Sequence, residues 1–274
     1  MGYILIKQKR HNAHPARIVC SEKLSAWQHS VNEIFAAKKS GLFETKDKTG
    51  APVILEWQKT NVREPKFVHI MHSVADLFIR AFSPNAMRFI KAHPDIVFMD
   101  KQDNPYRKLE PLFKKGIESV DWKAVEKEMT SMARLFWESR TSGEEFATKF
   151  TNSIFLFVTA KDDATKKPLG FVGYQIDDDD PQGAVILEPL AVVSEAQNRG
   201  IGKLLTASIF QLIPAVTRIT LSVESENETA LKAYQIWGFV EYQVQGPYHK
   251  LMEYRAEKSD ILQKTAAALK DLKK

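Results

Sequence analysis

The chain has 274 residues, of which 44% are hydrophobic and 27% charged, and its formal net charge is +5. This composition is typical of a globular protein and excludes a disordered or fibrous one; the length suits one large domain or one domain with an appended piece. The longest apolar runs, such as residues 154–158, are far shorter than the roughly 18 residues that a membrane-spanning helix needs. A single cysteine, Cys20, excludes an internal disulfide and a thiolate-rich metal cluster. Because the N-terminus has no secretory signal pattern, the sequence predicts a cytoplasmic protein without membrane association.

The positive charge is concentrated near the N-terminus. Residues 1–70 contain 12 basic and 6 acidic side chains. A basic segment can favour an acidic partner such as RNA, but no basic motif with interleaved aromatic residues supports RNA binding here. A solvated, charged surface explains the pattern better. We therefore do not expect a nucleic-acid partner. The sequence leaves open whether the protein forms a homodimer.

The first 62 residues predict a small appendage made of a helix and a hairpin. Apolar side chains recur at helical spacing over residues 22–39. Two runs with strand character, residues 42–46 and 53–58, flank the turn sequence Asp-Lys-Thr-Gly at 47–50. This pattern is typical of a β-hairpin, with Val53, Leu55 and Trp57 on one face.

The next part of the chain is mainly helical. Residues 67–70 predict a short strand, and a helix follows over residues 74–82. A second helix is expected over residues 83–93, with a serine cap and a proline in its first turn. Residues 95–120 give no clear pattern. A longer helix is expected from a cap at Asp121 to about residue 139.

Beyond residue 143 the pattern changes to closely spaced strands. The expected order is βββαβαββ, which at these lengths implies a mixed α/β sheet flanked by helices. A proline at position 189 indicates a bulge or a break in strand pairing. Strands are expected at 153–160, 169–176, 184–193, 218–223, 239–244 and 248–255, and helices at about 198–213, 226–237 and 259–272.

One turn carries the pattern of a ligand-binding loop. The strand over residues 184–193 leads into a helix start that contains Gly200 and Gly202, where the backbone can approach a ligand closely. Arg199 and Lys203 add positive charge, so the turn suits a pyrophosphate. A P-loop and a dinucleotide-binding fingerprint fit worse, because leucines replace the required Ser/Thr and the third glycine. By itself the Gly-x-Gly pattern supports a phosphate site and a plain helix start equally.

The downstream sequence decides between these two readings. The run Asn227-x-x-Ala230-x-x-x-Tyr234-x-x-x-Gly238-Phe239 follows the turn Gln197-x-x-Gly200-x-Gly202 after one intervening strand. Together the two segments resemble the characteristic motifs of the GNAT superfamily of N-acetyltransferases, and the topology is similar to that family over about residues 65–256.

There are two departures from that family's pattern. Ser194 stands where many members have a proline, and the region 83–140 is longer than the usual helical pair.

The resemblance implies a GNAT-like α/β (α+β) fold with a mixed, splayed sheet flanked by helices. Residues 1–62 would form the appendage of one helix and one hairpin. Residues 63–256 would form the acetyltransferase domain, with an enlarged helical region at 83–140, and residues 257–274 a C-terminal helix. We expect the appendage and the helical region to cover or shape the acceptor side.

The resemblance also implies acyl transfer, most often of acetyl, from acetyl-CoA to a primary amine by direct attack in a ternary complex. The acceptor would be a small molecule or a protein, with acetyl-CoA as cosubstrate and no metal. Pantetheine would lie between two splayed parallel strands, residues 184–193 and 218–223. The residues implied at the cofactor are Leu190, Ala191, Val192, Gln197, Asn198, Arg199, Gly200, Ile201, Gly202, Lys203, Asn227, Ala230 and Tyr234.

The reaction needs a base and an acid. The pKa of an alkyl amine is about 10.4, so only about one molecule in 10³ is neutral at pH 7. Glu188, among apolar neighbours in a strand, is the expected base, since partial burial raises the pKa of a carboxyl group. Glu224, at the end of the next strand, and a chain of water molecules are the alternatives. Tyr234 is the expected general acid for the leaving thiolate, and a backbone N–H near Val192 the expected oxyanion donor.

Two functions from other classes stay open. The domain could bind acyl-CoA as a regulatory module without turnover. Alternatively, the basic N-terminal part could make the protein an RNA- or protein-associated module.

Overall fold

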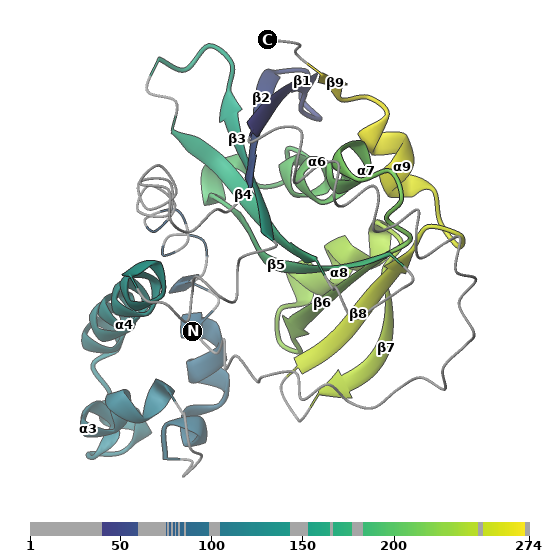
Figure 1. Ribbon diagram of the computed structural model, residues 1–274. Helices are drawn as coiled ribbons and strands as arrows, with labels where there is room; N and C mark the ends of the chain where they lie inside the picture. Colours follow the sequence, from purple (N-terminus) through teal and green to yellow (C-terminus); the bar gives the residue numbers. More distant parts are fainter. Residues whose placement is uncertain are drawn as a thin grey trace.

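A computed structural model gives the architecture of the chain (Figure 1). The helix expected over residues 22–39 and the strand expected over residues 67–70 lie outside the residues that it describes. The described residues are 40–59, 75, 77, 79, 81, 83, 84, 86–98, 105–142, 153–164, 167–176, 183–245 and 249–271.

Nine strands of the described chain form one sheet in the order β7-β8-β6-β5-β4-β3-β2-β1-β9. Neighbouring strands are antiparallel except for β5 and β6, which are parallel. The strands are β1 (Ser40–Lys46), β2 (Pro52–Lys59), β3 (Ser153–Ala160), β4 (Pro168–Ile176), β5 (Ala184–Val192), β6 (Arg218–Glu224), β7 (Val240–Gln245), β8 (His249–Arg255) and β9 (Lys270–Asp271).

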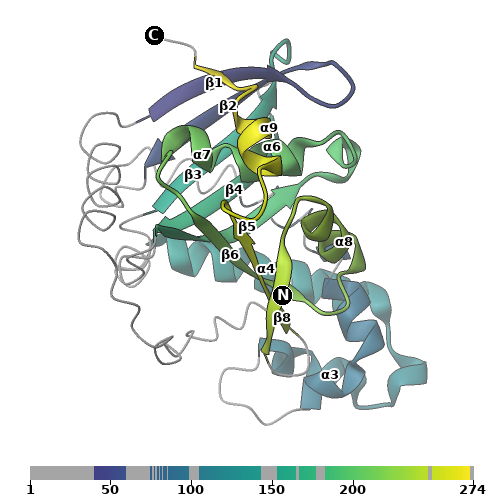
Figure 2. The same ribbon diagram turned by 90° about the vertical axis from the view of Figure 1, so that its right-hand side faces the viewer.

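Helices cover both faces of the sheet. Helices α6 (Ile201–Ala207), α7 (Ile209–Leu212) and α9 (Ile261–Ala266) lie together on one side, and α4 (Trp122–Ser142) lies on the other (Figure 2). Residues 154–158 of β3 are all buried, as expected for a central strand covered on both faces.

The predicted order βββαβαββ is confirmed: β3, β4 and β5 are followed by α6 and α7, β6, α8 (Glu228–Ile236), β7 and β8. The helix expected over residues 198–213 is divided into α6 and α7 at Ser208. The Ser208 hydroxyl donates to the carbonyl oxygen of Leu205 at 2.6 Å. A serine that bonds back to the preceding turn in this way weakens and bends a helix.

The predicted N-terminal hairpin is confirmed, but it belongs to the main sheet. Strands β1 and β2 pair across the 47–50 turn, and β2 continues the sheet by pairing with β3. The predicted apolar face, Val53, Leu55 and Trp57, is buried in the main hydrophobic core. Burial of this face explains why the hairpin packs into the sheet and does not stand apart from it.

The helical region has a hydrophobic core of its own. The predicted cap of α4 is confirmed: Asp121 Oδ1 accepts hydrogen bonds from the backbone N–H of Lys123 at 3.0 Å and of Ala124 at 3.2 Å. Val125, Met129 and other buried residues between 86 and 132 form a second cluster. The described residues between 94 and 119 form short elements: 3₁₀ turns at Pro94–Phe98, Pro105–Leu109 and Ile117–Ser119, and α3 (Glu110–Phe113). Elements this short give no periodicity, so the sequence showed no pattern there.

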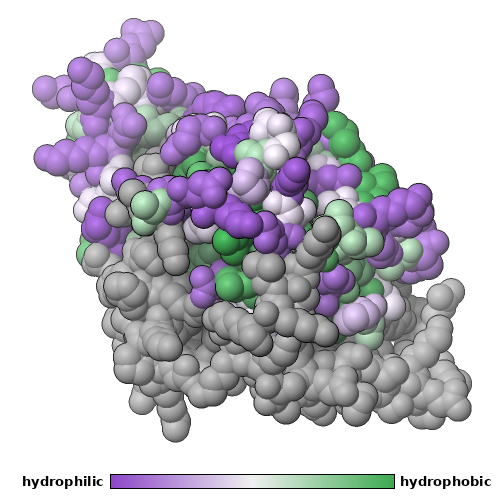
Figure 3. Space-filling view, turned by 90° about the horizontal axis from the view of Figure 1, so that it is seen from above, coloured by the Kyte–Doolittle hydropathy of each residue, from purple (hydrophilic) through white to green (hydrophobic). Residues whose placement is uncertain are grey.

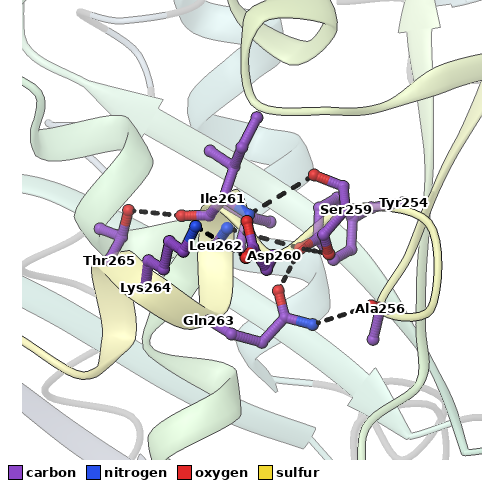
Figure 4. A network of polar contacts seen from close by, with 9 residues as sticks. All are labelled: Tyr254, Ala256, Ser259, Asp260, Ile261, Leu262, Gln263, Lys264 and Thr265. Atoms are coloured by element: carbon purple, nitrogen blue, oxygen red, sulfur yellow. Dashed lines mark hydrogen bonds and ion pairs between the residues drawn. The ribbon is translucent and has the colours of Figure 1, made fainter.

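The C-terminal helix is shorter than expected. Instead of continuing to about residue 272, α9 ends at Ala266, and β9 then pairs with β1, with Phe43 opposite Asp271. The helix is anchored to β8 through Tyr254, whose hydroxyl contacts the Ser259 carbonyl and the Gln263 side chain (Figure 4). Pairing with the free edge of β1 therefore overrides the helical preference of the alanine-rich segment.

Figure 3 shows the molecule from above, relative to Figure 1. On this side the surface of the described residues is mostly polar. None of the helices in the described part of the chain has the length and the apolar character that a membrane crossing would need.

Candidate functional site

Strands β5 and β6 diverge after three paired positions. They pair only from Ala184 opposite Arg218 to Ile186 opposite Thr220. Further on, β5 stays paired with β4 on one side, and β6 stays paired with β8 on the other. We call this divergence the fork, with residues 187–192 and 221–224 as its two arms. The facing edges of the arms present backbone N–H and C=O groups that no pairing of the described strands satisfies.

A bulge in β5 lies at the start of the fork. Tyr174 is opposite Leu187 and Val172 is opposite Leu190, so Glu188 and the proline after it share a single partner, Gly173. A Cβ at Gly173 would lie 2.5 Å from the Glu188 carbonyl oxygen, so only glycine fits there. The bulge expected at Pro189 is confirmed, and a bulge bends the strand that contains it. In a regular strand, side chains two residues apart point to the same face of the sheet. Because of the bulge, this rule does not place Glu188 and Leu190 on one face.

The turn after β5 has the conformation that its glycines suggest. Asn198 has a φ of 62° and Gly200, the residue before α6, a φ of 78°, both in the left-handed region. Gly202 is needed for packing, because a Cβ there would lie 3.0 Å from the indole ring of Trp237. We call residues 197–203 the glycine loop. Gly200 is thus favoured by its backbone conformation, and Gly202 by the lack of space for a side chain.

Three of the side chains that were expected to contact the cofactor instead form hydrogen bonds or an ion pair with other groups of the protein. Gln197 Nε2 donates to the Val192 carbonyl oxygen at 3.3 Å. Asn227 caps α8 by accepting a hydrogen bond from the Ala230 N–H at 3.2 Å. Arg199 forms an ion pair with Asp47. Lys203, in contrast, makes no ion pair with any residue of the described chain.

The partner of Arg199 was not identified from the sequence. Asp47 Oδ2 lies 2.7 Å from both Nε and Nη2 of Arg199, and the backbone N–H of Lys48 donates to the Arg199 carbonyl oxygen at 2.9 Å. Burial by itself would raise the pKa of Asp47, but hydrogen bonds from Thr49 and Arg199 outweigh it and lower the pKa. The hairpin, which we expected on the acceptor side, thus places its turn against the glycine loop.

The other members of the predicted cofactor set lie on the β5 arm, in the glycine loop and on α8. Ala191 and Ile201 are buried, and Leu190 and Val192 are half-buried. Leu190 and Val192 lie on the β5 arm, and Ala230 lies in the first turn of α8. These predicted residues therefore surround the fork.

Tyr234 lies on α8 and is 8% exposed. Its ring packs edge-on against Trp237 at 5.5 Å and against Phe239 at 5.4 Å between ring centroids. Burial raises the pKa of Tyr234, so its hydroxyl stays protonated at neutral pH. Among the described residues, no hydrogen bond to this hydroxyl is found.

Tyr174 on β4 lies close to Tyr234. Burial raises the pKa of Tyr174, and the charge of an ionised Tyr234 would raise it further. The Tyr174 hydroxyl lies 2.9 Å and 2.8 Å from the carbonyl oxygens of Leu205 and Thr206 in α6. Tyr234 therefore lies near the junction of β4 and α6, beside the fork.

The β6 arm ends beside the helical region. Burial raises the pKa of Glu224, the last residue of β6, and the guanidinium of Arg88 partly offsets this effect. The charge of Glu224 in turn adds to the raised pKa of Tyr106, which burial mainly causes. His93 Nε2 lies 3.5 Å from Glu226 Oε1. These contacts place the helical region next to Glu224, whereas Glu188 is half-buried on the β5 arm.

Within the described ranges, no three His, Cys, Asp or Glu side chains are close enough together to hold a metal ion.

A sequence comparison matches part of this chain to a family model. The model of the acetyltransferase (GNAT) family matches residues 121–239, which contain the fork, the glycine loop and Tyr234. No curated protein matches the chain.

Solved structures similar to this chain include three proteins with low sequence identity. The PaiA N-acetyltransferase from Thermoplasma acidophilum, in complex with coenzyme A, is 13% identical, with 73% of this chain and 98% of that one covered and a TM-score of 0.42. PH1933 from Pyrococcus horikoshii OT3 is 16% identical, with the same coverage and a TM-score of 0.40. NAA60 from Arabidopsis thaliana, in complex with a bisubstrate analogue, is 22% identical, with 43% and 84% covered and a TM-score of 0.34.

Proposed function

We propose that this chain transfers an acetyl group from acetyl-CoA to a primary amine. The match of residues 121–239 to the acetyltransferase (GNAT) family model supports this class of reaction. The observation that carries the proposal is the fork, because it opens an unpaired strand edge directly before the glycine loop. That combination suits a long ligand with amide groups along its length and a diphosphate at one end.

The β5 arm fits the pantetheine part of acetyl-CoA. The backbone of Leu190, Ala191 and Val192 can pair with the two pantetheine amides as an added strand would. The diphosphate would then bind at the glycine loop, through backbone N–H groups and the ammonium group of Lys203. Gln197, Arg199 and Asn227 contribute mainly by holding the loop and α8 in shape, since their side chains engage other protein groups.

In the proposed reaction, a neutral amine attacks the thioester carbonyl carbon. The C–N bond forms, the C–S bond breaks, the amine gives a proton to a base, and the departing sulfur receives one. Tyr234 is placed to donate to the sulfur, because its pKa is raised and its hydroxyl is not held by another described residue. A backbone N–H of the β5 arm near Val192 would stabilise the oxyanion.

For the base, the raised pKa favours Glu224. A base works best when its pKa lies near the working pH, and burial moves the pKa of Glu224 in that direction. Glu224 also ends the β6 arm next to the helical region, which would shape the acceptor side. Glu188, on the β5 arm, stays the alternative base, and the dependence of kcat/KM on pH in variants of the two residues distinguishes them.

Titration calorimetry of the purified full chain with acetyl-CoA, and with CoA, ATP and NAD for comparison, tests the proposal. We expect heat of binding with acetyl-CoA and CoA only. A screen of amines for acetyl-CoA-dependent thiol release then tests turnover. Absence of binding to any CoA compound would refute the proposal, whereas binding without thiol release for any amine would favour a regulatory acyl-CoA-binding module. Salt-dependent RNA binding without CoA binding would favour the nucleic-acid alternative.

A further inference from the structure

The turn between β1 and β2 is built around one buried carboxylate. The side chain of Asp47 is fully buried, with 0% exposed. Its Oδ1 accepts hydrogen bonds from Thr49 N at 2.8 Å, Thr49 Oγ1 at 2.6 Å and Ala51 N at 3.1 Å. Its Oδ2 faces Arg199. Because a buried charge is costly unless it is paired, the closed turn and the ion pair depend on one another.

Arg199 is held at two points by this turn. The guanidinium is fixed by Asp47 and the carbonyl oxygen by the backbone N–H of Lys48. Arg199 lies between Asn198 and Gly200, both with a positive φ, a conformation that glycine and asparagine adopt more readily than other residues. The turn therefore holds the glycine loop at the residue between its two left-handed positions.

The same turn brings a second lysine to the glycine loop. Lys48 is exposed, and its Cβ is the nearest atom, at 3.3 Å, to a Cβ placed on Gly200. Asp47 offsets the charge of Arg199, which leaves Lys203 as the glycine loop's cation without an ion-pair partner among the described residues. A diphosphate at Gly200 would lie within reach of the Lys48 side chain.

We infer that the β1–β2 turn, residues 47–51, is part of the acyl-CoA diphosphate site. Asp47 is a positioning residue that holds the glycine loop through Arg199, and Lys48 supplies a cation to the phosphate groups. This inference rests on the proposed function, since it assigns a further segment to the same cosubstrate.

The test compares CoA with pantetheine, which lacks the diphosphate. We expect Asp47→Asn and Lys48→Ala each to weaken CoA binding, by about tenfold or more and about three- to tenfold respectively, because charge-assisted contacts to the diphosphate are lost. Pantetheine affinity should not change in either variant. In steady-state assays, KM for acetyl-CoA should rise while kcat at saturation stays within about twofold.

Two controls make the test specific. Lys46→Ala removes the same charge from an exposed position on the same hairpin, and it should leave CoA affinity unchanged. Thermal unfolding shows whether Asp47→Asn is folded. If it is not, Lys48→Ala alone decides, since Lys48 is exposed and its truncation leaves the buried ion pair intact.

The outcomes separate this inference from the proposed function. If the unmodified chain does not bind CoA, the proposed function fails. If the unmodified chain binds CoA and the variants bind it equally well, the inference about the turn is wrong. An equal loss of CoA and pantetheine affinity would also overturn it, because the turn would then support the whole domain and not the diphosphate site.

Discussion

Tyr234 combines three properties that a hydrogen-bond donor to a leaving thiolate needs. It is 8% exposed, its pKa is raised by burial, and its ring is fixed by Trp237 and Phe239. A rigid, protonated hydroxyl can donate to sulfur without reorganisation when the C–S bond breaks. Packing alone would need only the ring, so the hydroxyl is the group to test.

Replacing Tyr234 by Phe keeps the ring and removes the hydroxyl. We expect kcat to fall by about 10²-fold or more, with acetyl-CoA affinity nearly unchanged, because general-acid assistance to the sulfur is lost. Steady-state kinetics and calorimetric titration measure the two quantities. Tyr174→Phe is the matched control: it removes another buried hydroxyl, one that bonds to α6 and has no proposed chemical role. Unchanged turnover in Tyr234→Phe would exclude the hydroxyl from the mechanism.

Glu224 gives a prediction for the dependence of rate on pH. Because burial raises its pKa, the acidic limb of kcat/KM should lie above the pH expected for an ordinary glutamate. Glu224→Gln should lower kcat/KM about 10²-fold or more at neutral pH, with recovery at high pH where the amine is already neutral. Glu188→Gln is the matched comparison, and the same loss in that variant with none in Glu224→Gln would assign the base to Glu188.

Glu224→Gln, which should lower activity, should have the opposite effect on stability. A carboxyl whose pKa is higher in the folded protein stabilises the fold while it is protonated, and this contribution is lost as the pH rises through the folded pKa. Above its folded pKa, the ionised Glu224 is therefore a destabilising group. Glu224→Gln should raise Tm or leave it unchanged at pH 7, measured by thermal unfolding at the pH of the assays. A decrease in Tm would point to structural support by the carboxylate.

At the scale of elements, the fork depends on the bulge in β5, and the bulge depends on Gly173. Gly173→Ala would place a Cβ 2.5 Å from the Glu188 carbonyl oxygen. We expect a loss of about 1–3 kcal/mol in the free energy of unfolding, because overpacking displaces backbone. Affinity for acetyl-CoA should also fall, because the β5 arm is moved.

Gly116→Ala is the control for Gly173→Ala. Gly116 has a φ of 90°, and no atom lies within 4 Å of the position that a Cβ would take, so alanine there is strained but meets no obstacle. It should lower the free energy of unfolding by about 1–3 kcal/mol, because this backbone conformation is essentially restricted to glycine, and it should leave acetyl-CoA affinity unchanged. Equal affinity losses in the two variants would mean that binding follows general stability and not the bulge.

The sequence allowed the local elements of this site to be predicted, but not its long-range contacts. The order of helices and strands along the chain, the bulge at Pro189 and the glycine loop follow from spacing and from the special conformations of glycine and proline. The pair Asp47–Arg199 joins residues 152 positions apart, and a turn sequence such as Asp-Lys-Thr-Gly is explained fully by the hairpin itself. The strand β9 was missed for a similar reason, since its partner is β1. In each case a tertiary partner, which has no local signal, decides the outcome.

At the scale of the molecule, two segments outside the central βαβ unit reach the two arms of the fork. The hairpin turn contacts the glycine loop after the β5 arm, and the helical region contacts the end of the β6 arm. Acetyl-CoA between the arms would therefore bring the first segment into contact with the diphosphate, while the second segment would remain available to the acceptor amine. Under the proposed function, the hairpin turn would therefore serve acetyl-CoA and the helical region would serve the amine.

Hydrogen exchange of the full chain measures this division directly. A saturating concentration of acetyl-CoA should slow exchange on the β5 arm, in the glycine loop and in the turn at residues 47–51, because the bound ligand opposes local opening there. Exchange in β8 and α9 should change little. Pantetheine should protect the β5 arm but neither the glycine loop nor the turn, since it lacks the diphosphate. Uniform protection by both ligands, or protection by acetyl-CoA that leaves out the turn, would contradict the assignment of the hairpin to the cosubstrate side.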